Sequence, residues 1–173
     1  DISAVDIATG DLLWQRPTQS TLIYDEGFFL KTSDIIADKD SLFFSIDINT
    51  GTLNWEQKIN SNLRPTLVDK YIFTVSLSGY LVVIDKQSGN IVRSTNIFKS
   101  LKIKKRSKVE PVGFILGKKN IYLTTDNGKL LVIDIRTGIT SSILKIDNDK
   151  ISRPSVVNQE LYIIKDNSII KLN

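Results

Sequence analysis

A short pattern, Asp-x-x-(Thr/Ser)-Gly, recurs four times in this chain of 173 residues. Average amino-acid frequencies predict roughly 0.1 chance matches in a chain of this size, so the four copies form an internal repeat. The closing glycines are spaced by 41, 38 and 49 residues, a period suited to a four-stranded blade of a β-propeller. Each copy runs from an aspartate to a glycine: Asp6 to Gly10, Asp47 to Gly51, Asp85 to Gly89, and Asp134 to Gly138.

The residues around each copy indicate β-strands. An apolar run precedes every aspartate, as in 81–84, and a second short run follows the glycine, as in 53–55. The aspartate can accept hydrogen bonds from N–H groups two or three residues ahead, and the glycine can take a positive φ. Each copy is therefore predicted to close a hairpin between two strands. Helices should be nearly absent, because no sustained 3.6-residue period occurs.

A proline opens each of the later units, at Pro65, Pro111 and Pro154. Proline is tolerated at a strand start, where its missing N–H breaks no ladder. Each unit then contains a strand that begins at the proline (strand a), a middle strand (b), a strand that ends at the aspartate (c) and a strand that follows the glycine (d). The predicted fold class is all-β, a β-propeller built of four-stranded antiparallel blades. Strands c and d of one blade are expected in 1–16, three blades in 32–59, 65–97 and 109–146, and strands a to c of a last blade in 154–173.

The unit at 32–59 is expected to be short of a strand. Tyr71 to Asp85 spans two strands and a turn, but only five residues lead from Leu42 to Asp47. We expect the hairpin between strands b and c to be missing there, with 34–37 as strand a. The alternative is that 28–31 supplies strand b.

Absences in the composition exclude several kinds of chemistry. The chain has no cysteine, which excludes disulfides, thiolate metal sites and cysteine nucleophiles. It has no histidine, which removes Ser-His-Asp catalysis and histidine-ligated zinc or haem. No apolar run reaches the eighteen residues of a membrane-spanning helix. Methionine is absent too, so we expect the chain to be part of a longer protein, with any signal peptide or lipid anchor upstream.

The positive charge is concentrated in one stretch. Residues 99–108 hold six basic groups and no acid, more than the whole net charge of +4. A nucleic-acid-binding module would spread such charge over a face and interleave aromatic residues. About ten residues are inserted here relative to the other units, so we expect an exposed, mobile loop that attracts an acidic partner or lipid surface. The alternative is a plain solvated linker.

The repeats resemble those of the quinoprotein-type (PQQ-like) β-propeller family. Residues 81–89 and 44–55 are similar to the family consensus, which runs aromatic-Ala-Leu-Asp-x-x-Thr-Gly-x-x-x-Trp. The resemblance covers the chain except 17–31 and 98–108, and it implies a ring of eight blades. It also implies that a tryptophan four residues after the glycine docks between neighbouring blades. That position holds Trp14, Trp55, Arg93 and Ser142, so two copies depart from the consensus.

Two branches of that family imply different functions. The quinone-cofactor alcohol and sugar dehydrogenases need calcium ligands, a catalytic aspartate, a ring-stacking tryptophan and commonly a cysteine lid. The other branch is a cofactor-free lipoprotein scaffold of the outer-membrane β-barrel assembly machinery. Because cysteine is absent and both tryptophans occupy the repeat position, we favour a non-enzymatic scaffold without cofactor or metal. The resemblance then implies a periplasmic, outer-membrane-associated protein that binds the barrel assembly component. A dehydrogenase fragment is the alternative, and a sensor or adaptor propeller is a third class.

Candidate partner-binding residues lie in the connections between blades. In a propeller the connections from strand d to the next strand a gather at one end, where loops on a rigid base commonly bind. An apolar or arginine anchor within a polar rim is typical of a protein interface, which points to Leu63 and Arg64 as an exposed pair. The candidates are Leu63, Arg64, Lys104, Lys105, Arg106, Glu110 and Arg153. Arg64, Glu110 and Arg153 have an alternative structural role, pairing with a neighbouring blade.

Two further features have a functional and a structural interpretation. Asp147 and Asp149 could bind calcium, but the Gly and Glu of a calcium loop are missing, so a polar turn is favoured. Trp14 and Trp55 could stack on a cofactor, but a tryptophan at the repeat position is expected in the core between blades.

The chain is expected to form an open arc of about four blades rather than a closed ring. A four-bladed ring would contain two candidates for one strand c, residues 2–5 and 169–172. An arc leaves apolar residues uncovered at its walls, and such patches favour self-association. We therefore expect the isolated chain to be poorly stable or to oligomerise.

Overall fold

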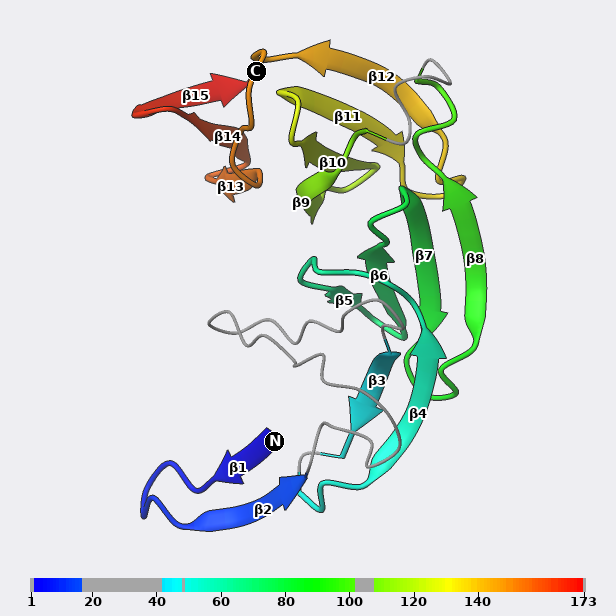
Figure 1. Ribbon diagram of the computed structural model, residues 1–173, viewed down its shortest axis with the longest axis vertical. Helices are drawn as coiled ribbons and strands as arrows, with labels where there is room; N and C mark the ends of the chain where they lie inside the picture. The colour runs from blue at the N-terminus through cyan, green and yellow to red at the C-terminus, as the bar shows by residue number, and fades with distance from the viewer. Residues whose placement is uncertain (1, 17–41, 48, 102–107, 173) are drawn as a thin grey trace. The chain divides into compact units, whose positions relative to one another are not determined.

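The computed structural model describes residues 2–16, 42–47, 49–101 and 108–172 (Figure 1). Every regular element in these ranges is a β-strand, and every pair of neighbouring strands is antiparallel. The prediction of an all-β chain of antiparallel blades is confirmed. The chain divides into two compact units.

The first unit comprises residues 1–62 together with 87–89. Its described strands form two hairpins, β1 with β2 and β3 with β4. Residues 34–37, expected as strand a of the 32–59 blade, and 28–31, the alternative for its strand b, lie outside the described residues. The strands are β1 (Ile2–Val5), β2 (Leu12–Arg16), β3 (Leu42–Ile46) and β4 (Leu53–Lys58).

The second unit comprises residues 63–86 and 90–173 and contains three sheets. Two sheets are four-stranded, in the orders β5-β6-β7-β8 and β9-β10-β11-β12, and the third has the order β13-β14-β15. The first sheet contains β5 (Thr66–Val68), β6 (Tyr71–Val75), β7 (Tyr80–Asp85) and β8 (Ile91–Asn96). The second contains β9 (Pro111–Leu116), β10 (Asn120–Thr125), β11 (Lys129–Asp134) and β12 (Thr140–Lys145). The third contains β13 (Ser155–Val157), β14 (Glu160–Lys165) and β15 (Ser168–Leu172).

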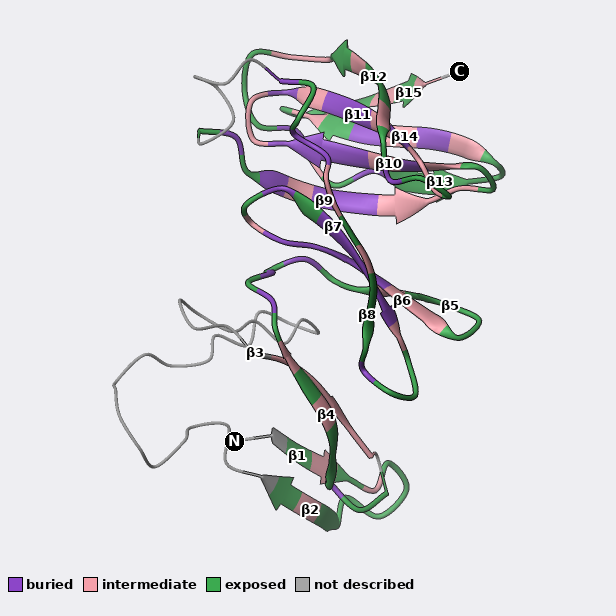
Figure 2. Cartoon of the chain, turned by 90° about the vertical axis from the view of Figure 1, so that its right-hand side faces the viewer, coloured by how far each residue is buried: buried purple, intermediate pink, exposed green. Residues whose placement is uncertain are grey.

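The core of the second unit lies between successive sheets. One cluster of buried residues joins the first two sheets through Phe73, Val75, Leu81, Phe114 and Leu123, among others. A smaller cluster joins the second sheet to the third through Leu130, Leu161 and Ile163. The middle strands are the most buried, and outer strands such as β8 and β12 are largely exposed (Figure 2). This follows from the sequence, because the middle strands are almost continuously apolar.

The predicted aspartate turns have the expected hydrogen bonds. The carboxylate of Asp134 accepts hydrogen bonds from the N–H groups of Arg136 and Thr137, at 3.1 and 2.8 Å, and from the Thr137 hydroxyl. Asp6 and Asp47 accept equivalent bonds in their own turns. The four closing glycines have φ between 69° and 78°, a region that favours glycine. Each turn therefore joins a strand c to a strand d of one sheet.

The Asp134 carboxylate should make the stability of the fold depend on pH in the acid range. The backbone N–H of Thr137, followed by its hydroxyl, lowers the pKa of Asp134 below its ordinary value of 3.8. A carboxylate with a lowered folded-state pKa stabilises the fold above the unfolded pKa, and this contribution is lost as the pH falls through the folded value. Urea midpoints of the Asp134→Asn variant should therefore fall less steeply below about pH 4 than those of the wild type. Identical slopes would contradict this role for the carboxylate.

A β-bulge lies beside every one of these turns, on the strand that follows it. The strand register shifts by one residue there, so one residue of strand d has no direct partner on strand c. Bulges increase local twist, which suits the steep twist of a blade. Sequence patterns did not predict this feature. The unpaired residues are Leu13, Asn54, Val92 and Ser141.

In three copies, the residue four positions after a turn glycine contacts another aspartate turn. A Cβ atom on Gly51 would lie 2.8 Å from the Trp14 ring, and one on Gly89 would lie 2.5 Å from the Trp55 ring. Both tryptophans are half-buried rather than enclosed in the core. In the third copy Nη2 of Arg93 donates to the Ile135 carbonyl at 2.8 Å, and Nη1 donates to the Arg136 carbonyl. Arg93 thus occupies the position of the consensus tryptophan, and it contacts an aspartate turn through hydrogen bonds rather than through an aromatic ring.

Candidate protein-binding site

One end of the second unit gathers the connections between its sheets; we call it the connection end. It consists of residues 63 and 64 directly before Pro65, the turns between strands b and c at 76–79 and 125–128, and the connections at 97–101, 108–110 and 146–154. Backbone hydrogen bonds hold turns and connections together: Ile97 N–H donates to the Gly79 carbonyl and Ile146 N–H donates to the Gly128 carbonyl, both at 2.9 Å. The predicted gathering of connections therefore occurs between sheets of this unit.

The turns at the connection end share a second motif, Ser/Thr-x-x-Gly. The hydroxyl oxygens of Ser76 and Thr125 each accept the N–H of the residue four positions on, at 3.0 and 3.2 Å. A connection lies directly over each closing glycine. A Cβ on Gly79 would lie 2.1 Å from the Phe98 ring, and one on Gly128 would lie 2.4 Å from the Asp147 carbonyl oxygen.

Leu63 is not the exposed anchor that the sequence predicted. It is only 9% exposed and belongs to the buried cluster that contains Phe98, Leu101 and Val109. Buried residues of the connection at 97–101 thus share one apolar cluster with the leucine side chain. Arg64, the next residue, is exposed. The expectation of an exposed pair is therefore wrong for Leu63, and the charged residue alone faces solvent.

Glu110 is held by the neighbouring turn. Its N–H donates to the Asp126 carboxylate at 2.9 Å, and its carbonyl accepts the Asp126 N–H at 3.0 Å. These bonds fix the backbone of Glu110 directly before β9, and the residue is exposed. Asp126 was not singled out in the sequence, although its place in the repeated Ser/Thr-x-x-Gly turn was a usable signal.

Arg153 is exposed on a backbone that is closely packed. A Cβ on Gly113 would lie 2.3 Å from the Cβ of Arg153, so the connection before the third sheet approaches β9 at a residue without a side chain. The adjacent Ser152 hydroxyl accepts the Ile164 N–H at 2.8 Å and donates to the Arg153 carbonyl at 2.9 Å. The backbone of Arg153 is thus fixed, while the residue faces solvent.

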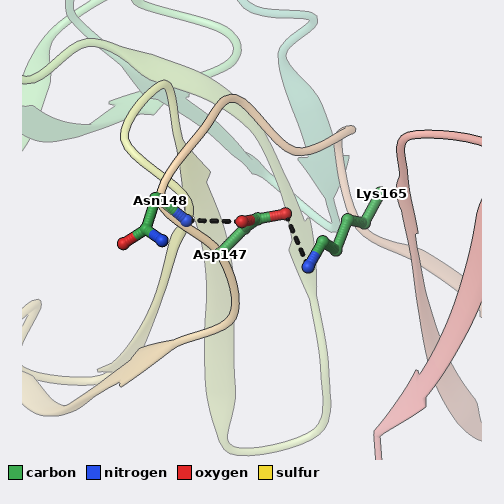
Figure 3. Close-up of polar contacts among 3 residues, drawn as sticks. All are labelled: Asp147, Asn148 and Lys165. Carbon is green, nitrogen blue, oxygen red and sulfur yellow. Dashed lines mark hydrogen bonds and ion pairs between the residues drawn. The ribbon is translucent and has the colours of Figure 1, made fainter.

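Asp147 forms an ion pair between sheets (Figure 3). Its Oδ2 lies 2.9 Å from Nζ of Lys165 on β14, and its Oδ1 accepts the Asn148 N–H at 2.6 Å. The Lys165 hydrogen bond, followed by the Asn148 N–H, lowers the pKa of the Asp147 carboxyl, and the same pair raises the pKa of Lys165. In the described part of the chain, no three acidic side chains are grouped where they could hold a metal ion.

The basic run is described only at its two ends. Lys99 and Lys108 are exposed, whereas Leu101 and Val109 are 6% and 4% exposed and belong to the core. Lys104, Lys105 and Arg106 lie outside the described residues. The run is therefore anchored on both sides by buried apolar residues, a feature that its charge pattern did not indicate. Among the described residues, no helix could span a membrane.

Comparisons with known proteins agree with this architecture. The family model described as outer membrane protein assembly factor BamB matches residues 1–95. The BamB of Legionella pneumophila (strain Paris) is 23% identical over 132 residues, covering 75% of this chain and 31% of that protein. The BamB of Moranella endobia (strain PCIT) is 20% identical over 182 residues, covering 95% of this chain and 44% of that protein. The chain thus spans less than half the length of these relatives.

A solved structure supports the fold alone. The β-propeller domain of Cps50 (Swd1) from Myceliophteria thermophila is 14% identical, with a TM-score of 0.56 over 75% of this chain and 44% of that one. The sheets described above are therefore propeller blades. Because the family model matches more than half of the chain, the chain belongs to the PQQ-type propeller family of the outer membrane protein assembly factor BamB.

Proposed function

We propose that this chain is part of a non-enzymatic scaffold that binds a protein during assembly of outer-membrane β-barrels. The observation that carries the proposal is the family match over residues 1–95. In this proposal the scaffold needs no cofactor. It acts at the periplasmic face of the outer membrane, held there by a lipid anchor on the longer protein. The partner is the barrel component of the assembly machinery.

The connection end is the proposed contact surface. Arg64, Glu110 and Arg153 are exposed at the connection end. Arg64 follows the buried Leu63, and the backbone of Glu110 is hydrogen-bonded to Asp126. Arg153 lies close to Gly113 of β9. A rigid base lowers the entropy lost when such side chains bind a partner. Arginine is among the residues enriched at energetically important positions of protein interfaces.

Affinity measurements on the full-length protein and the purified barrel component test this proposal. The double substitution Arg64→Ala with Arg153→Ala should weaken binding about tenfold or more, because each removed side chain is a proposed anchor. Replacement of Lys118 and Lys119 by alanine is the matched control. These exposed cations follow β9, at the opposite end of the same sheet from Pro111. Equal losses for both pairs would indicate a general charge effect, and no loss for the arginines would contradict the proposal.

A further inference from the structure

The turn between β10 and β11 contains the one Asn-Gly dipeptide of the sequence, Asn127–Gly128. A glycine after an asparagine carries no side chain to hinder attack of its backbone nitrogen on the asparagine amide. The Gly128 nitrogen bonds to Cγ of Asn127, its proton is lost, and ammonia leaves from the same carbon. Water then opens the resulting succinimide ring to aspartate or to isoaspartate, whose main chain is longer by one carbon. The dipeptide is therefore chemically able to deamidate.

Thr125 holds both reacting groups in the folded turn. Its hydroxyl donates to Oδ1 of Asn127 at 2.8 Å, and its carbonyl accepts the Gly128 N–H at 3.2 Å. Ring closure requires the Gly128 nitrogen to give up this hydrogen bond together with its proton. It also requires the Asn127 amide to turn toward that nitrogen and away from the hydroxyl. Thr125 is 0% exposed, so both restraints are enclosed, and the folded turn opposes the reaction.

The connection at 146–154 is a second restraint, because it lies directly over Gly128. The Gly128 carbonyl accepts the N–H groups of Ile146 and Asp147, both at 2.9 Å. A Cβ on Gly128 would lie 2.4 Å from the Asp147 carbonyl oxygen, so no space is left there for a longer main chain. The ion pair between Asp147 and Lys165 holds this connection to β14 (Figure 3). The reaction therefore requires the connection to lift from the turn.

The equivalent turn of the first sheet shows that the repeat does not need an asparagine here. Ser78 occupies the place of Asn127, and its hydroxyl lies 3.0 Å from that of Ser76, which occupies the place of Thr125. The closing glycines have the same left-handed conformation, with φ of 80° in the first sheet and 70° in the second. Serine at position 127 is therefore compatible with this turn, and it removes the reactive amide.

We propose that Asn127 is a latent deamidation site, which Thr125 and the connection at 146–154 hold closed and which reacts when this connection opens. Folded proteins open locally at free energies below that of global unfolding, so the reaction records such openings. Isoaspartate does not fit under the connection, and its formation therefore keeps the turn and the connection apart. This inference does not depend on the proposed function.

Peptide mapping by mass spectrometry, on full-length protein aged at neutral pH, measures the reaction at Asn127. The rate in the folded protein should be at least about tenfold lower than in a synthetic peptide of residues 123–131, because opening must come first. Lys165→Gln should raise the rate severalfold, since it removes the ion pair that holds Asp147. Lys171→Gln is the matched control, because it removes the ion pair with Glu160 on the same sheet and should leave the rate unchanged. Equal rates in protein and peptide, or equal rises in both variants, would overturn the proposal.

Variants of the turn itself distinguish restraint from activation. Thr125→Val should speed the reaction at Asn127, whereas Thr125→Ser keeps the hydroxyl and should not. A slower reaction in Thr125→Val would show that the hydroxyl activates the amide, and the proposal would then be wrong. Hydrogen exchange tests the consequence: the amides of Ile146 and Asp147 should exchange faster in aged wild-type protein than in fresh protein. They should not change when Asn127→Ser is aged in the same way, and equal changes in both proteins would contradict the proposal.

Discussion

Replacement of Phe98 by alanine is expected to lower the free energy of unfolding by about 3–5 kcal/mol, the usual cost of removing a buried aromatic ring. Phe98 is 1% exposed, and its ring covers Gly79, the turn glycine of the first four-stranded sheet. The ring also belongs to the cluster that joins the first two sheets of the second unit. Its loss therefore removes both the cover of a turn and part of the core between sheets.

Urea unfolding followed by circular dichroism measures this effect. Ile139→Ala is the control, because Ile139 lies in the same unit and is 63% exposed. Substitutions at such positions usually change stability by less than about 0.5 kcal/mol. A Phe98→Ala variant no less stable than Ile139→Ala would contradict the placement of the connection over the turn.

Replacement of Gly128 by alanine should be nearly as damaging, by about 2–5 kcal/mol. About 1–2 kcal/mol arises because φ is +70°, a left-handed conformation that a Cβ disfavours. A further 1–3 kcal/mol, roughly, arises from overpacking, because the new Cβ would lie 2.4 Å from the Asp147 carbonyl oxygen and 2.7 Å from that of Asp149. These obstacles are backbone atoms, so no side-chain rotation relieves them.

Gly10→Ala separates the two contributions. Gly10 has φ +78°, but nothing lies within 4 Å of a Cβ built on it. Only the backbone cost of about 1–2 kcal/mol is expected there. Equal losses for both variants, measured by the same urea unfolding, would show that the connection does not press on Gly128.

The repeated aspartate turns made most of the fold predictable. Four copies at a blade-like spacing indicated hairpins, and each predicted hairpin occurs, because the aspartate–N–H bonds and the glycine φ are local properties. The bulge beside each turn was missed, since only one residue pair lies between the bulge and the turn, too few to show a change in the period-two pattern. Arg93 shows a similar limit. Its departure from the tryptophan consensus was visible, but its bonds to the next turn depend on tertiary packing.

The candidate site was predictable in position but not in detail. Three prolines located the strand starts, and the connections before them do gather at one end of the second unit. Exposure of individual residues was not predictable, because it depends on which connection folds over which turn. Leu63 illustrates this: its neighbours in sequence are polar, yet it belongs to a buried cluster that also contains Phe98 and Leu101, far along the chain. The Ser/Thr-x-x-Gly turns were a second repeat that the sequence contained and that was overlooked.

Site-specific photo-crosslinking tests the central claim, that the connection end of this scaffold binds a protein partner. A photoreactive amino acid would replace Arg64, Arg153 or Lys118 in the full-length protein, in the presence of the barrel component of the assembly machinery. We predict crosslinks to that component from positions 64 and 153 and none from position 118, at the opposite end of the sheet. Crosslinks from position 118 alone would contradict the account.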